Sequence, residues 1–233
     1  MITLPNVDTL RDGKDVSCVR LASDASPKVQ RPKAENSNTG VTSDYAQTEG
    51  HIWFVLRATY GRAIQACEEL KKKSIMTYVP MGCVMKEING KKKRVKTPLL
   101  PNIIFAYTTR KEIQKFVKQP APTSKYLRYY LDKTKDTEGM TGLNPPVTVK
   151  ENEMRSFIRV TSTNNEHVMV INPRRCHYKS GDLVRVTEGQ FKGVVGKVVR
   201  AAGQQRVAVS VEGVCTVVTA YIPSGFMTIL SQD

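Results

Sequence analysis

The sequence predicts an α+β sandwich of an antiparallel sheet and short helices, followed by a small all-β barrel of the SH3-like kind. Strand-like and helix-like segments follow one another in mixed order over residues 51–160, which is typical of an α+β domain. Short valine-rich segments separated by glycines then occupy residues 178–230, as in small barrels. Residues 1–50 are rich in Ser, Thr, Asn, Asp and Pro and lack sustained periodicity. We therefore expect residues 1–50 to be a flexible N-terminal extension.

The first domain begins with a strand at residues 51–58, which holds Trp53, the only Trp of the chain. A helix should follow through Lys73, because Ala63, Cys67 and Leu70 recur at the spacing of one helix face. Later elements are expected as a strand at 74–81, a strand at 102–108, a helix after the capping box Thr109-x-x-Glu112, a strand at 126–131, and a helix after a second capping box, Thr148-x-x-Glu151. Met154, Phe157 and Ile158 form the apolar face of that last helix.

The stretch before the 102–108 strand has the most distinctive pattern. Asn89-Gly90 is a strong two-residue hairpin signal, so residues 83–88 and 91–97 should pair as a protruding, basic hairpin. The apolar run from Leu99 to Phe105 follows at once, interrupted by a Pro-Asn turn. One interpretation is a charged loop beside an ordinary core strand. The other interpretation is one element with two contacts. The tip of the hairpin would contact nucleic acid, and the apolar turn Leu99-Leu100-Pro101, which we call the elbow, would contact a protein surface.

Residues 161–177 contain Thr-Ser-Thr-Asn-Asn and Asn-Pro-Arg-Arg and are expected to be a linker. The barrel segments beyond it are predicted at 183–186, 194–195, 197–200, 206–211 and 215–219, with Tyr221-Ile222-Pro223 as the closing strand and turn. The glycines between them supply turns with positive φ and allow strands to approach closely.

The net charge of +15 and the pI of about 9.7 indicate an anionic partner. Residues 51–160 carry most of this charge, with 22 Lys and Arg against nine Asp and Glu. Nucleic acid is the first expectation and a membrane surface the second. No apolar run approaches the roughly 20 residues that a membrane span needs, and the N-terminus has no apolar signal region. Five Cys without CxxC spacing are expected to be reduced thiols, so we expect a cytoplasmic protein without membrane contact.

We find no convincing catalytic set, so we expect no enzyme activity, no metal and no cofactor. Three His are scattered, and Cys176-His177 lacks the second ligand pair that a metal site needs. Gly193–Gly196 lies between short strands and does not open a helix, which excludes a phosphate-binding loop of the usual kind.

Two motifs resemble a known family. Pro-Leu-Leu-Pro-Asn-Ile-Ile-Phe at 98–105 is similar to the P-L-F-P-(G/N)-Y-(hydrophobic)-F signature of the NusG transcription elongation factors. Asn102 resembles the operon-specific paralogues of the RfaH and UpxY types. Gly181 to Val198 resembles the KOW motif, with the motif residues Gly189, Phe191, Gly193 and Gly196. Together with the Trp53-Phe54-Val55 strand they resemble the NusG N-terminal (NGN) plus KOW architecture over about residues 51–230.

This resemblance implies an elongation or antitermination factor that binds RNA polymerase and suppresses pausing or termination. Its NGN domain would span 51–160 and dock on the clamp coiled coil of the polymerase, and its KOW domain, at 178–230, could bind a ribosomal protein or a termination factor. The implied polymerase contacts are Trp53, Phe54, Leu99, Leu100, Pro101, Ile103 and Phe105. The cations expected to meet DNA or RNA are Arg62, Lys71, Lys72, Lys91, Lys92, Lys93, Arg94 and Lys96.

Two further expectations concern the docking patch and the barrel. Alternation along the 102–108 strand suggests that helices cover one sheet face and leave the other for a partner, with Phe54, Leu100, Ile103 and Phe105 lining or supporting the patch. The valines of 194–218 disfavour a helical state of the barrel, unlike the switching domain of RfaH. The alternatives are a KOW-type RNA-binding or ribosome-associated protein and an enzyme acting on nucleic acid.

Overall fold

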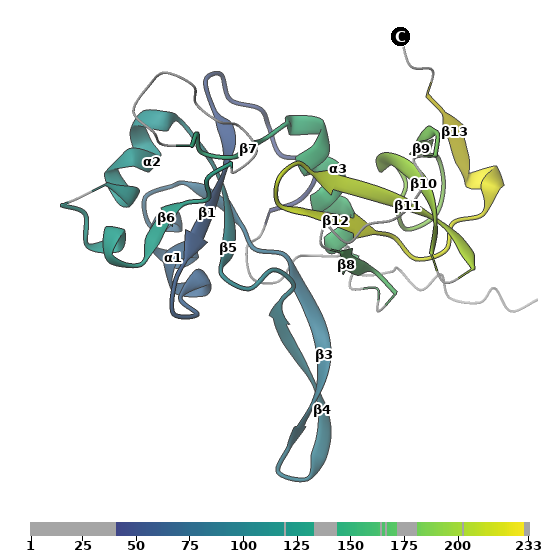
Figure 1. Ribbon diagram of the computed structural model, residues 1–233, viewed down its shortest axis with the longest axis horizontal. Coiled ribbons are helices and arrows are strands. Elements are labelled where there is room, and N and C mark those ends of the chain that lie inside the picture. The colour runs from purple at the N-terminus through teal and green to yellow at the C-terminus, as the bar shows by residue number, and fades with distance from the viewer. Residues whose placement is uncertain are drawn as a thin grey trace, which may run out of the picture. The chain divides into compact units, whose positions relative to one another are not determined.

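An antiparallel sheet forms the centre of the first domain in the computed structural model (Figure 1). The structure describes residues 41–118, 120–132, 144–163, 165, 167–171, 181–201 and 203–230. Sheet order is β2-β5-β1-β6, with the short β7 also paired to β1. The strands are β1 (Ile52–Ala58), β2 (Met76–Tyr78), β5 (Ile103–Thr108), β6 (Leu127–Tyr129) and β7 (Thr148–Val149).

Both faces of this sheet are covered. All six residues of β5 are buried, and so are Trp53 to Leu56 of β1. On one face Ile104 and Ala106 join a cluster with Phe54 and residues of α1 and α2. On the other face Ile103, Phe105 and Tyr107 pack with Trp53 and with residues of α3. The expectation that one face is free for a partner is therefore wrong, because α3 and a segment before β1 cover that face.

The two helices of the first face form where the sequence predicts them. Helix α1 (Ala63–Lys71) buries Ala63, Cys67 and Leu70, the predicted inward stripe. Helix α2 (Arg110–Val117) begins with the predicted capping box, since Thr109 and Glu112 each bond to the backbone of the other. A short 3-10 helix, Pro122–Lys125, then leads into β6.

Helix α3 (Glu151–Thr161) covers the second face with Met154, Phe157 and Ile158, all fully buried. Its predicted capping box is absent. The N-cap residue is Lys150, without a side-chain cap, because Thr148 is part of β7. Glu151 pairs instead with Arg155, one turn further along the helix, at 3.1 Å.

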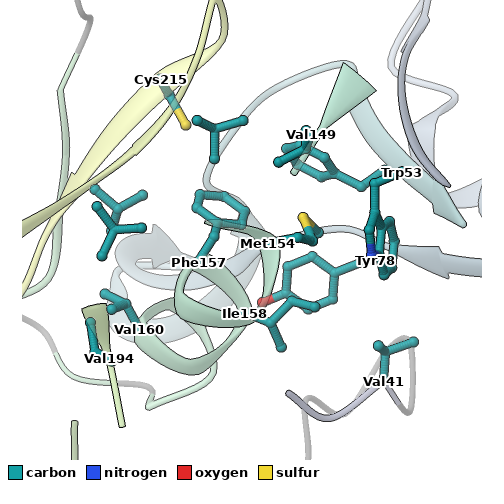
Figure 2. Packing of buried hydrophobic residues seen from close by; sticks show 14 of the residues in the cluster. Val41, Trp53, Tyr78, Val149, Met154, Phe157, Ile158, Val160, Val194 and Cys215 are labelled. Atoms are coloured by element: carbon teal, nitrogen blue, oxygen red, sulfur yellow. The ribbon is translucent and has the colours of Figure 1, made fainter. Parts of the chain in front are cut away.

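Residues 41–49, which we call the strap, also lie on the second face. The sequence places them in a flexible extension, but Val41 and Tyr45 are buried in the same cluster as Trp53 and α3. Figure 2 shows Val41 beside the Trp53 side of this cluster. The rest of the predicted extension lies outside the described residues.

The C-terminal region is a six-stranded antiparallel sheet with the order β13-β9-β10-β11-β12-β8. Its strands are β8 (Met169–Ile171), β9 (Leu183–Val186), β10 (Val195–Ala201), β11 (Gln204–Val211), β12 (Cys215–Val218) and β13 (Met227–Ile229). Two details differ from expectation. Residues 169–171, inside the predicted linker, pair with β12. The closing strand is β13, which follows a 3-10 helix at Ser224–Phe226, and not Tyr221–Pro223.

Helix α3 contacts the barrel as well as the first sheet. Its neighbours there are β10, β11 and β12. Figure 2 shows Phe157 between the sheet residues and Cys215, with Val160 beside Val194. One apolar cluster therefore runs from Trp53 to the barrel valines. Among the described residues, no helix is long and apolar enough to span a bilayer.

Candidate nucleic-acid and protein interface

A two-stranded hairpin extends from the sheet (Figure 1), formed by β3 (Met81–Ile88) and β4 (Lys91–Pro98). Among the strands of the described residues, these two pair only with each other. The predicted Asn89-Gly90 turn is confirmed, with φ of 53° and 71° at its two residues. Positive φ at both positions matches the right-handed twist of a hairpin and favours Asn-Gly.

The register distributes the cations over both faces of the hairpin. Lys86 lies opposite Lys93, and Ile88 lies opposite Lys91, so three cations share one face. The pairing of Glu87 with Lys92 places Lys92, Arg94 and Lys96 on the other face. All six cations are exposed. The predicted set of Lys91, Lys92, Lys93, Arg94 and Lys96 therefore forms one charged ribbon, with Lys86 added.

The cross-strand pair Lys86–Lys93 places two like charges directly opposite each other. Like charges directly opposite each other destabilise a strand pair, by up to about 1 kcal/mol. Glu87 is the only acid in either strand. A bound polyanion would remove this repulsion, and the major groove of a duplex admits a two-stranded ribbon. The hairpin is therefore a candidate surface for a phosphate backbone.

The base of the hairpin is fixed to the apolar elbow. The Leu99 amide donates to the Pro80 carbonyl at 2.8 Å, and a Cβ at Gly82 would overlap the Leu99 side chain. Asn102 then turns the chain with φ of 67°, and its carbonyl accepts from the Ala58 amide at 2.8 Å. Asn tolerates this left-handed conformation better than most residues. Hairpin and sheet are thus joined by a short, well-bonded turn.

The structure separates the proposed polymerase contacts into two groups. Leu99 and Leu100 are half-buried and Pro101 is exposed, so these three form the accessible elbow. Trp53, Phe105 and Ile103 are buried on the second sheet face, with Ile103 at 8% exposure. Phe54 is buried on the opposite face, against α1 and α2. The buried four can support the elbow through packing but cannot touch a partner.

Two arginines were missed by sequence reasoning. Arg57 lies opposite Ile103 on one side and opposite Arg128 on the other. Both arginines are exposed on the second sheet face, and neither forms an ion pair with any residue that the structure describes. The signal was present in β1, where Trp53, Val55 and Arg57 share one face and the arginine breaks the apolar series. Arg57 therefore lies next to Ile103, the first residue of β5 after the elbow, and the Arg57–Arg128 pair has no acidic partner among the described residues.

The remaining predicted cations do not join the hairpin as one group. Arg62 is the N-cap of α1, and its guanidinium lies 5.3 Å from the ring centroid of Tyr126. Lys71 ends the same helix and Lys72 is its C-cap. About nine residues of helix, roughly 14 Å, separate Arg62 from the two lysines.

The KOW-motif residues are structural in their geometry. Gly189 and Gly193 have φ of 77° and 84°, which favours glycine. A Cβ at Gly196 would overlap the Ala208 carbonyl of the neighbouring strand. Phe191 is buried at 3% exposure, in the same apolar cluster as the barrel valines.

The described residues hold no cluster of acids, His and Cys that could bind a metal. Cys67 and Cys215 are buried, and burial raises the pKa of both thiols, so both stay protonated at neutral pH. Cys176 and His177 lie outside the described residues.

The family model described as transcription termination factor NusG matches residues 51–158. No curated protein matches the chain. Among solved structures, the chain is similar to a Thermotoga maritima protein titled "Domain interaction in Thermotoga maritima NusG", at 17% identity and a TM-score of 0.38. That similarity covers 78% of this chain and 98% of the other.

Proposed function

Since residues 51–158 match the NusG family model, we propose that this chain is a transcription elongation or termination factor that binds RNA polymerase through its elbow and suppresses pausing or termination. The polymerase element is the clamp coiled coil, and the action is confined to specific operons, as in the RfaH and UpxY types. The protein acts from the cytoplasm and by binding alone.

The observation that carries the proposal is the juxtaposition of the elbow and the hairpin. Leu99 and Leu100 remain half-buried after the sheet has been covered on both faces. They follow directly on the charged ribbon of β4. Apolar surface of this kind supports a protein contact, and the ribbon supports a nucleic-acid contact next to it.

In the proposed mechanism the protein binds RNA polymerase and nucleic acid at the same time. The elbow and the Arg57–Arg128 pair would dock on the polymerase, which fixes the direction of the hairpin. The hairpin cations would then meet DNA or RNA phosphates near the elongation complex, giving affinity without sequence choice. A protein bound in this way restrains the clamp and opposes the opening that accompanies pausing.

A basic RNA-binding or ribosome-associated protein is the alternative, because KOW barrels also occur in such proteins. The test is quantitative capture with the tagged full-length chain at physiological salt, followed by transcription on a template with a strong pause. We expect RNA polymerase subunits in excess over ribosomal RNA and a shorter pause half-life. Capture of ribosomal RNA without polymerase, and an unchanged pause, would favour the alternative.

A further inference from the structure

The strap is bound to the first domain through Tyr45. The Trp53 indole N–H donates to the Tyr45 hydroxyl at 2.6 Å, and the two ring centroids are 5.4 Å apart in an edge-on arrangement. The Tyr45 ring also lies 5.4 Å from that of Tyr107, whose hydroxyl accepts from the Thr48 amide at 3.0 Å. These contacts satisfy the only polar atom of a fully buried Trp side chain.

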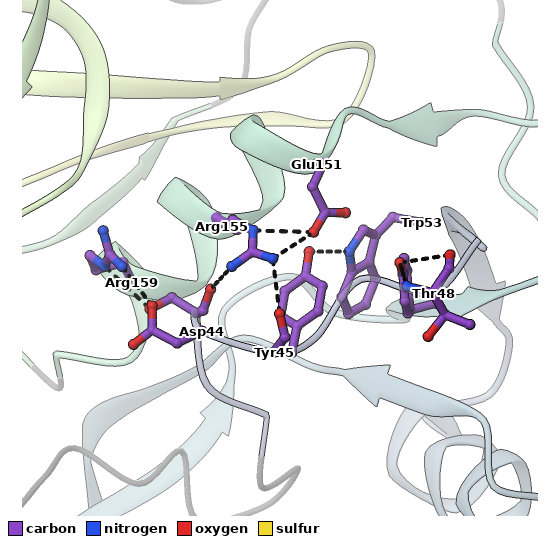
Figure 3. Close-up of polar contacts among 9 residues, drawn as sticks. Asp44, Tyr45, Thr48, Trp53, Glu151, Arg155 and Arg159 are labelled. Carbon is purple, nitrogen blue, oxygen red and sulfur yellow. Dashed lines mark hydrogen bonds and ion pairs between the residues drawn. The ribbon is translucent and has the colours of Figure 1, made fainter. Parts of the chain in front are cut away.

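Two arginines of α3 hold the strap from the other side (Figure 3). Arg155 donates to the carbonyls of Ser43 and Tyr45, at 2.9 Å each, and its guanidinium lies 4.5 Å from the Tyr45 ring centroid. Arg159 donates to the Asp44 carboxylate at 3.0 Å and to the Ser43 hydroxyl at 3.2 Å. Charge-assisted bonds of this kind fix a long side chain in one direction.

The barrel meets α3 at the same arginine. Gly193, with φ of 84°, lies so close to Arg159 that a Cβ there would overlap the guanidinium. One turn earlier on α3, the Ser156 hydroxyl accepts a hydrogen bond from the Val195 amide of β10 at 3.2 Å. Arg159 therefore lies between the strap and the barrel, and its orientation affects both contacts.

From this arrangement we infer that the strap controls the docking of the barrel on α3, through Arg159. With Asp44 and Ser43 in place, the guanidinium is held in the position that the Gly193 turn fits. Without these two partners, the Arg159 side chain regains its rotamer freedom and occupies the space beside Gly193. The close approach of β10 to Ser156 is then lost. A partner that takes up residues 41–47 would therefore release the barrel. This goes beyond the proposed polymerase contact, which lies at the elbow.

The Val195 amide gives a direct test by hydrogen exchange in the full-length protein. Its acceptor belongs to α3, so its protection reports docking. The Val186 amide donates to the Val194 carbonyl inside the barrel at 2.9 Å, so its protection reports barrel folding. In the double variant Ser43→Ala, Asp44→Ala we expect protection at Val195 to fall about tenfold or more, with Val186 unchanged. Arg159→Met should give the same pattern.

Glu49→Ala is the matched control, because it removes an exposed acid at the end of the same strap. It should leave both amides as they are. Unchanged Val195 protection in the double variant and in Arg159→Met would overturn the inference. An equal fall at Val195 and Val186 would also overturn it, since the strap would then only stabilise the whole fold.

Discussion

At the scale of single residues, the most unusual feature of the first domain is that Arg57 and Arg128 lie opposite each other on neighbouring strands. A cross-strand pair of like charges is unfavourable within the fold. Charged side chains can protect an edge strand from aggregation, which is a sufficient reason for Arg128 on the edge strand β6. Arg57 lies on the central strand β1, where that reason does not hold.

We therefore predict that Arg57→Ser weakens polymerase binding by about 2 kcal/mol, roughly 30-fold, because interface arginines are often dominant contacts. The domain should melt at nearly the same temperature, since the side chain is exposed. Titration of the variant against core polymerase measures the first and calorimetry the second. Lys125→Ser, which removes another exposed cation, is the control and should bind as the native chain does.

Glu112 gives the N-terminus of α2 a pH dependence. The Thr108 hydroxyl, at 2.6 Å, and then the Thr109 amide donate to its carboxylate and lower its pKa. A lowered pKa means that the stabilisation is present above the ordinary Glu pKa of about 4.3 and is lost as the pH falls through the folded value. The protection factor of the Glu112 amide, which donates to the Thr109 hydroxyl in this cap, should therefore fall as the pH drops below about 4, after division by the intrinsic exchange rate at each pH.

Glu112→Gln should make that protection factor nearly independent of pH over the same range. Glu68→Gln, at an exposed position on α1, should leave the pH dependence intact. If the pH dependence persists in Glu112→Gln, it is caused by the titration of another group.

Sequence patterns predict residues whose contacts are close in the sequence. They do not predict residues whose position depends on contacts with distant parts of the chain. Thr109 and Glu112 are three positions apart, so their capping box is legible in the sequence and is confirmed. Tyr45 is the single aromatic residue in a polar segment and shows no periodicity. Its place is set by the Trp53 N–H and by Arg155, 110 positions away, which no local pattern reveals.

At the scale of elements, the basic hairpin was the most predictable, because Asn89-Gly90 specifies both the turn and the register. We predict that changing Lys91, Lys92, Lys93 and Arg94 to Ala reduces the log–log salt dependence of duplex binding. The slope should fall by about 0.9 per lost contact, roughly 3.6 if all four meet phosphates.

The control removes the same charge elsewhere, by changing Lys111, Lys115, Lys118 and Lys125 to Ala. All four are exposed on or near α2. We expect this variant to keep most of the native slope. Equal slopes for the two variants would mean that net charge, and not the hairpin, governs binding.

The barrel is a second element for which composition is decisive. Val207, Val209 and Val217 are buried in a sheet of six strands, and a helix would lose both their packing and their favoured χ1 rotamers. We predict that the isotopically labelled full-length protein shows β-strand chemical shifts in each of the strands β9 to β13, with and without denaturant below the transition. A helical subpopulation there would contradict a permanent barrel.

The ends of the barrel were less legible than its centre. Strands β8 and β13 have three residues each, too few for alternation to show. Each exists because a neighbouring strand edge accepts it, β12 for β8 and β9 for β13. Whether such short strands form depends on pairing with a distant strand, and the local sequence does not predict it.

At the scale of the whole molecule, the main departure from expectation is the covered sheet face. Alternation along β5 shows that two faces exist, but not which later element covers the second. Helix α3 does so with Met154, Phe157 and Ile158, and the strap completes the cover over Trp53. The covered sheet is therefore not available to a partner, and our proposal places the partner contact at the elbow, next to Arg57.

The measurement that tests this most directly is the affinity of Leu100→Asp for RNA polymerase, compared with its thermal stability. Leu100 is half-buried, so we predict binding at least about 30-fold weaker than that of the native chain, with a melting temperature nearly unchanged. Leu131→Asp, at another partly exposed leucine near the far end of β6, should bind normally. Native affinity in Leu100→Asp, or weaker binding only in proportion to lost stability, would contradict docking through the elbow.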